Sequence, residues 1–142
     1  MKMKTQDGSE LIPKNLHRLV GIIAGNSTRE AVEKNSFIVN EVPHEFQIAN
    51  NEKLLASILE SLIATVVNIS AGSCIRVRAR EYDDIMFLSV RDNSSLESYT
   101  ATGKLEEVQV LARQINGSIR IDRIDNKFTT ISVTFPNLPK AA

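Results

Sequence analysis

The sequence predicts a two-layer α/β sandwich, in which a mixed and mostly antiparallel sheet carries its helices on one face. The chain of 142 residues is 42% hydrophobic, which suits one domain with a substantial core. Two long segments carry apolar residues at helical spacing, and pairs of short strand-like segments lie between and after them. Hairpins separated by helices favour a sheet with the helices packed on one side.

The first predicted elements are helical. Residues 1–13 form a polar leader, and residues 14–24 have the spacing of one buried helix face. Gly25-Asn26 interrupts this pattern, and the capping-box spacing of Ser27 and Glu30 predicts a second, short helix after the interruption. The apolar face of the first helix consists of Leu16, Leu19, Val20 and Ile23.

The longest predicted helix covers residues 51–68 and follows two predicted short strands, 37–39 and 46–48. Apolar pairs recur every four residues along it, which gives a broad apolar stripe at the 3.6-residue period. Asn50 or Asn51 is the expected N-cap, and Ala71-Gly72 marks the end of the helical pattern. The pairs are Leu54-Leu55, Ile58-Leu59, Leu62-Ile63 and Val66-Val67.

The strands that follow are predicted from alternation. Between residues 75 and 80, apolar residues alternate with arginines, as in a strand with one buried and one solvated face. A turn at 82–84 leads into a more apolar strand at 85–90. The arginines are Arg76, Arg78 and Arg80; either they form an ordinary solvated face, or they bind a phosphate-bearing partner.

The last third of the chain predicts one helix and two closing strands. After a short loop, residues 102–116 have amphipathic spacing, and Gly117 is a natural helix end. Strands are expected at 119–121 and 131–135, where apolar residues again alternate.

Composition excludes several classes of function. With 17 basic and 17 acidic residues the formal net charge is zero, which argues against a nucleic-acid partner. No apolar run approaches the roughly 20 residues of a membrane helix, so neither membrane insertion nor a secretory signal is expected, and the location is cytoplasmic. One cysteine and two histidines predict neither disulfides nor a metal site, and no catalytic constellation stands out.

From about residue 36 to residue 136 the chain resembles the ATP-binding domain of sensor histidine kinases, which has the GHKL or Bergerat fold. Four segments carry the resemblance: NEVPHEFQIANNEKLLASILESLIATVV, SVRDNSS, LEEVQVLARQINGSIRI and KFTTISVTFP. They are similar to the first ATP-site helix with its preceding strand, the adenine motif, the second helix, and the closing strand. The resemblance implies a histidine-kinase-like ATPase domain at 36–142, preceded by a leader and helical segment at 1–35.

The resemblance also implies the site residues. Asp92 stands where the family's aspartate accepts the exocyclic amine of adenine, and Thr129 stands in the closing Gly-Thr-Thr strand. Ser61 and Thr65 occupy the two asparagine positions of the ATP-site helix, one of which helps to hold magnesium. Gly103 takes the place of the glycines that end the family's lid.

Several positions depart from the family's motifs. Hydroxyls are poorer magnesium ligands than carboxamides or carboxylates, and the two glycines of the adenine motif are replaced by Ser94 and Leu96. Gly103 follows Asp92 by only 11 positions, so the family's lid of tens of residues is missing. The residues themselves also allow simpler interpretations, namely a plain turn at Asp92 and a solvated helix strip at Ser61 and Thr65.

These features predict a degenerate histidine-kinase-type domain in two-component-type signalling, with ATP binding impaired or lost, that acts through protein contacts. No cofactor is expected, and ATP with Mg²⁺ is the cofactor if the site still works. Expected partners are a signalling protein, a second copy through residues 14–34 if the apolar stripe of the first helix is not buried, and a weakly bound adenine nucleotide. The alternatives are a working ATP-binding kinase domain and a stand-alone regulator of the anti-sigma kinase type.

Overall fold

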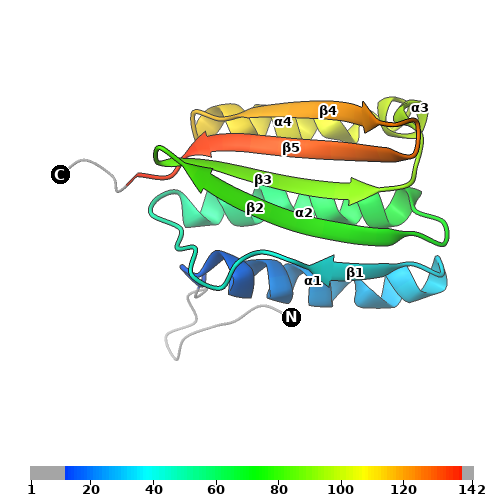
Figure 1. Cartoon of the computed structure of the whole chain (residues 1–142), viewed down its shortest axis with the longest axis horizontal. Coiled ribbons are helices and arrows are strands. Elements are labelled where there is room, and N and C mark those ends of the chain that lie inside the picture. The colour runs from blue at the N-terminus through cyan, green and yellow to red at the C-terminus, as the bar shows by residue number, and fades with distance from the viewer. Residues whose placement is uncertain (1–11, 139–142) are drawn as a thin grey trace.

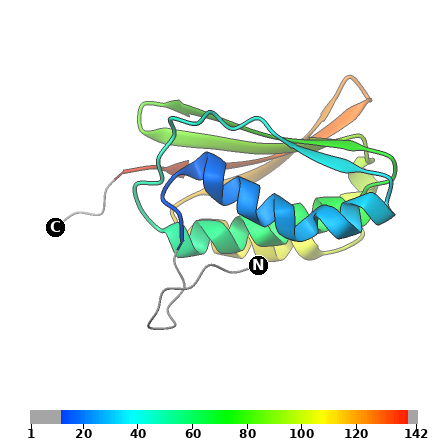
Figure 2. The ribbon, with the colours of Figure 1, turned by 90° about the horizontal axis from the view of Figure 1, so that it is seen from below.

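The computed structural model describes residues 12–138 and contains one five-stranded sheet with helices on one side (Figures 1 and 2). The strand order is β1-β2-β3-β5-β4, and only the β1–β2 pair is parallel. The predicted fold class is confirmed. The strands are β1 Phe37–Asn40, β2 Cys74–Tyr82, β3 Ile85–Asp92, β4 Ser118–Ile124 and β5 Phe128–Pro136, and the helices are α1 Leu16–Glu33, α2 Glu52–Ile69, α3 Leu96–Thr100 and α4 Lys104–Gln114.

The core lies between the sheet and a layer formed by α1, α2 and α4. Helix α2 is central and packs against both other long helices. Its paired apolar residues are almost all fully buried, as their spacing predicts, and each such side chain contributes about 1.5–3 kcal/mol. The sheet supplies its inward-facing positions to the same core. The fully buried residues of α2 and the sheet include Leu55, Ile58, Leu59, Leu62, Ile63, Val66, Val67, Ile75, Val77, Leu88, Ile131 and Val133.

Helix α1 is one continuous helix of 18 residues, so the predicted break at Gly25-Asn26 is wrong. Asn15 caps its start by accepting a hydrogen bond from the Arg18 amide at 3.0 Å. Beyond the glycine, the buried side of the helix continues to Ala31, which is 1% exposed. Burial on both sides of Gly25 therefore outweighs the roughly 1 kcal/mol cost of a glycine inside a helix.

The apolar face of α1 packs into the core of the same chain. Its four residues are 0–4% exposed, so the condition for using this stripe as a homodimer surface is not met. These residues are Leu16, Leu19, Val20 and Ile23.

The predicted strand at 46–48 is absent from the sheet. Instead this segment lies against the start of α1, where Gln47 forms an isolated antiparallel bridge with Asn15 and the Leu16 amide donates to the Phe46 carbonyl at 3.0 Å. Asn137 fixes the segment from the other side, because its side chain bonds the Gln47 carbonyl and the Ala49 amide, each at 2.8 Å. The loop from β1 to α2 is thus held by side chains and helix ends, which no periodic pattern reveals.

The remaining differences concern lengths and one short helix. Strands β4 and β5 are longer than predicted, and α4 is shorter, beginning at Lys104 and ending at Gln114. Helix α3 is not predicted at all; it falls in the segment expected to be a loop. Of the predicted leader, residues 1–11 lie outside the described part of the chain.

We predict that Gly117→Ala destabilises the fold by about 1–3 kcal/mol. A Cβ added at this position would lie 2.6 Å from the backbone oxygen of Thr134 in β5, so the α4–β4 connection would have to move. Gly25→Ala is the matched control: nothing lies within 4 Å of the new Cβ, and the helix should gain about 0.5–1 kcal/mol. Urea unfolding of both variants measures the difference, and equal stability would contradict the close packing at Gly117.

Candidate functional site

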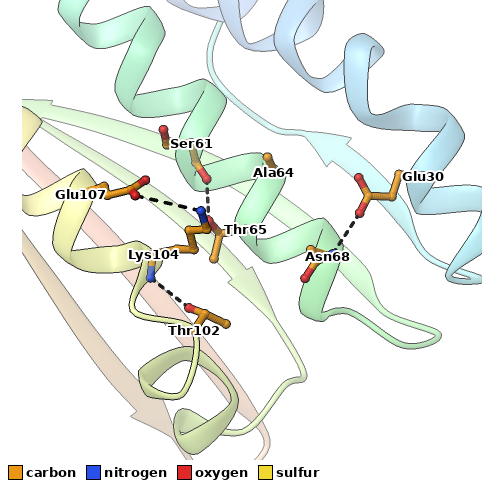
Figure 3. A pocket seen from close by; sticks show the side chains of 8 residues that line it. All are labelled: Glu30, Ser61, Ala64, Thr65, Asn68, Thr102, Lys104 and Glu107. Carbon is orange, nitrogen blue, oxygen red and sulfur yellow. Dashed lines mark hydrogen bonds and ion pairs between the residues drawn. The ribbon is translucent and has the colours of Figure 1, made fainter.

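A cleft of about 410 Å³, lined mainly by residues with polar side chains, opens between α2, the start of α4 and the end of α1 (Figure 3). Ser61 and Thr65, both predicted from the sequence, line it from α2. Gly103 lies at its edge between two lining residues, Thr102 and Lys104. The structure therefore brings three of the five predicted site residues to one place.

Most of the polar groups that line this cleft bond to one another or to the backbone (Figure 3). The Thr65 hydroxyl donates to the Ser61 carbonyl at 2.7 Å, one turn back along α2. The Lys104 ammonium lies 4.0 Å from the Glu107 carboxylate, and Asn68 donates to Glu30 at 3.4 Å. Two carboxylates and one ammonium line the cleft, so its local charge is negative.

Gly103 is the N-cap residue of α4 and has a left-handed backbone, with φ at +69°. Glycine adopts this conformation without the steric cost that a side chain would add. The cap has no side-chain hydrogen bond, and Glu106 and Glu107 stand in the first turn of the helix. These carboxylates already satisfy the preference of a helix N-terminus for negative charge.

Asp92 lies apart from the cleft, at the end of β3, and is 1% exposed. One of its carboxylate oxygens accepts a hydrogen bond from the Tyr99 phenol, and the other accepts from the Ser94 hydroxyl at 2.6 Å. A buried carboxylate needs such donors, because a buried charge without partners is strongly destabilising. The residue that the resemblance assigns to adenine is thus bonded within its own chain.

Tyr99 is the site residue that the sequence did not reveal. It comes from α3 and is 1% exposed. The N-cap of this helix is Ser95, whose hydroxyl accepts a hydrogen bond from the Ser98 amide at 3.3 Å. Burial and the hydrogen bond to Asp92 raise the pKa of the Tyr99 phenol well above its ordinary value near 10. The only sequence signal was the Ser95-to-Ser98 spacing of a capped turn after Asp92.

Thr129 pairs with Asp92 across the β3–β5 ladder and is also 1% exposed. Its hydroxyl does not bond the carboxylate; it donates to the Ser94 carbonyl at 2.6 Å and accepts from Arg123 at 3.1 Å. Arg123 donates to the same carbonyl at 2.7 Å. Thr129 and Arg123 therefore fix the backbone of the loop that covers Asp92.

Structural comparison places this fold among the catalytic domains of histidine kinases. Full-length ShkA in complex with AMPPNP matches with a TM-score of 0.78 and 18% identity over 100% of this chain and 33% of ShkA. The histidine kinase AdeS of Acinetobacter baumannii matches with a TM-score of 0.76 and 11% identity, over 88% of this chain and 66% of AdeS. The catalytic domain of the histidine kinase ThkA matches with a TM-score of 0.71 and 12% identity, over 88% of this chain and 94% of that domain.

No family model matches the sequence, and neither does any curated protein. The chain has the fold of a histidine kinase ATP-binding domain and spans a third of ShkA and about two thirds of AdeS. At identities of 18% or less the similarity establishes the fold alone. Within residues 12–138, no helix has the length and hydropathy that crossing a membrane requires.

We predict that the Tyr99–Asp92 contact makes the free energy of unfolding decrease as the pH rises into the alkaline range. Because the folded-state pKa of Tyr99 is raised above its unfolded value, this contribution is complete below about pH 10 and falls by about 1.4 kcal/mol for each further pH unit. Tyr99→Phe should remove that dependence and cost about 1–3 kcal/mol at neutral pH, because Asp92 loses a donor.

Urea unfolding from neutral to alkaline pH measures both effects. In a Tyr82→Phe background, phenolate absorbance comes from Tyr99 alone and should appear only as the protein unfolds. Ionisation of Tyr99 near pH 10 in the folded protein would contradict the buried contact.

Proposed function

We propose that this chain is a histidine-kinase-type domain whose adenine site is closed by its own side chains. The observation that carries the proposal is the engagement of both Asp92 oxygens by the Tyr99 and Ser94 hydroxyls at a position 1% exposed to solvent. In this interpretation the domain does not turn over ATP. It acts in two-component-type signalling in the cytoplasm, through contacts with other proteins.

The energetics of Asp92 favour a closed site. Adenine can reach the carboxylate only if the buried phenol of Tyr99 leaves, which breaks a hydrogen bond to a charged group worth roughly 1.5–3 kcal/mol and exposes the ring. The exocyclic amine of adenine returns one hydrogen bond of the same kind. The hydrogen bonds therefore cancel, and the remaining cost is exposure of the buried Tyr99 ring. At about 1.5–3 kcal/mol for a fully buried side chain, this cost lowers adenine affinity by about tenfold or more.

The cleft at Ser61 and Thr65 does not fit a magnesium–triphosphate group either. Mg²⁺ prefers carboxylate and carboxamide oxygens, whereas α2 offers hydroxyls here, one of which donates to its own helix. A triphosphate would also face the carboxylates of Glu30 and Glu107 with one ammonium, Lys104, to offset its charge. We therefore propose that the protein needs neither ATP nor Mg²⁺ as a cofactor.

The alternative is a working ATP-binding kinase domain. The 410 Å³ cleft favours it, because the cleft is bordered by the residues that resemble the family's phosphate site. A stand-alone regulator of the anti-sigma kinase type is a further alternative. It would have the same fold and would bind nucleotide in the same cleft.

We predict that titration calorimetry with Mg-ATP and with adenosine gives at most weak and similar binding, and that phosphate release does not exceed the buffer control. Any residual binding should depend on Asp92, since its carboxylate is the one adenine contact left, so Asp92→Asn should remove it. Thr28→Ala on the outer side of α1 serves as a control away from the cleft.

Mg-ATP binding far tighter than adenosine binding would show a phosphate site and overturn the proposal. Tyr99→Ala provides a second measurement, because removal of the phenol should open space beside Asp92. Improved adenosine binding by this variant would support the proposal that Tyr99 fills the adenine position.

A homodimer through residues 14–34 belongs to the same proposal, on the outward side of α1 rather than on its buried stripe. A groove of about 340 Å³ lies between α1 and β1 and includes the small residues Gly21, Ala24 and Gly25. Val32 and Phe37 also line it and are 65% and 59% exposed. Two copies related by a two-fold axis could each place these apolar side chains in the other's groove.

We predict that sedimentation detects a weak dimer that Val32→Glu abolishes, because the substitution would bury a carboxylate in an apolar contact. Val110→Glu is the matched control, since Val110 is 54% exposed on α4, outside the groove. A native protein that stays monomeric at high concentration would contradict the dimer.

A further inference from the structure

The side of the sheet that faces away from the helices is strongly enriched in arginine. In Figure 2 the described helices all lie below the sheet, and none covers its upper side. The alternation of buried and exposed positions assigns the outward residues of each strand. Among them are five arginines and one acidic residue, Asp122; the arginines are Arg76, Arg78, Arg80, Arg91 and Arg120.

The charges of this arginine face are not fully compensated by its neighbours. Glu41 is shared between Arg76 and Arg78 at 3.2 and 3.1 Å, and Asp122 pairs with Arg120 at 3.1 Å. The helices carry the opposite bias, with seven acidic and five basic residues in α1 to α4. A chain with no net charge is thus divided into a basic sheet face and a weakly acidic helical layer.

Fold stability does not explain this arrangement. Arg76 and Arg91 are directly opposite each other in the β2–β3 ladder, where like charges are destabilising. Arg80 has no hydrogen bond or ion pair within residues 12–138, and Arg91 lies 5.0 Å from the centre of the Phe128 ring. A solvated sheet face needs polar side chains, but it does not need one sign of charge.

Aromatic side chains lie among the arginines. Phe87 is the cross-strand neighbour of Arg80 and is 37% exposed, as is Phe128 beside Arg91, and Tyr82 is 73% exposed at the end of β2. Arginine and aromatic residues together are typical of the energetic centres of protein–protein interfaces. Guanidinium groups bind carboxylates in a bidentate manner that lysine cannot reproduce.

We propose that the arginine face is a docking surface for an acidic segment of a protein partner, with carboxylates on the arginines and apolar side chains against the exposed aromatics. Its basic surplus is local, because beyond a distance of about 8–10 Å screening and the acidic helical layer cancel it. A short acidic segment meets only this surplus, whereas a long nucleic acid would need basic charge over a larger area.

This inference rests on the proposed function in one respect: it names the surface for the protein contacts that the domain makes. It is otherwise separate from the nucleotide site, because the cleft lies on the helical side of the sheet. The docking surface and the closed adenine site can therefore be contradicted by separate experiments. Tight binding of Mg-ATP would contradict the closed site and would leave the docking surface unaffected.

The test uses fluorescence anisotropy with a short labelled peptide of Glu, Asp and Tyr, and with a single-stranded DNA oligonucleotide of equal formal charge. Arg80→Glu/Arg91→Glu should weaken peptide binding by about tenfold or more, in line with measured couplings of close interfacial charge pairs. The control variant Arg18→Glu/Lys53→Glu makes the same charge change on α1 and α2, and should bind within about twofold of the native protein.

The single variant Arg91→Glu separates binding from folding. It places a carboxylate opposite Arg76, so its thermal stability should equal or exceed that of the native protein while peptide affinity falls. Absence of peptide binding, or equal loss in both double variants, would overturn the proposal. Tighter binding of the oligonucleotide than of the peptide would overturn it in favour of a nucleic-acid surface.

Discussion

The buried carboxylate of Asp92 is the constraint on which the rest of the candidate site depends. It lies at the end of β3, opposite Thr129 of β5, and is 1% exposed to solvent. A carboxylate in this position must receive hydrogen bonds from within the protein, and Ser94 and Tyr99 supply them. Helix α3, the short connection to α4, and the bonds from Thr129 and Arg123 to the Ser94 carbonyl all hold these donors in place.

The chain has the fold of a histidine kinase catalytic domain, and the residues that the resemblance assigns to a nucleotide site lie in two places. The cleft that contains Ser61 and Thr65 is open and weakly acidic, whereas Asp92 is buried apart from it and bonded to Ser94 and Tyr99. Such a domain retains a rigid sheet and helical layer, and it presents different charge on its two sides. This difference in charge is the basis of the proposal that the domain acts through contacts with other proteins.

The elements that could be predicted from the sequence are those in which apolar residues recur at a regular local spacing. The doublets of α2 appear in the sequence because one side of a buried helix must be apolar over more than a quarter of its circumference. The alternation around Arg76 and Arg78 determined β2 and its outward face in the same way. The resemblance of four segments in order then indicated the fold, although it left the bonding of Asp92 open.

Features that depend on contacts between segments far apart in the sequence could not be predicted in this way. The break expected at Gly25 does not occur because burial of α1 against α2 compensates for a weak helix former. The segment at 46–48 leaves the sheet because the backbones of Lys14 and Leu16 and the side chain of Asn137 bind its backbone. The contact between Tyr99 and Asp92 could not be predicted from the sequence for the same reason. Its role arises from the buried carboxylate of Asp92, seven residues away, and burial depends on the assembled structure and not on a local sequence pattern.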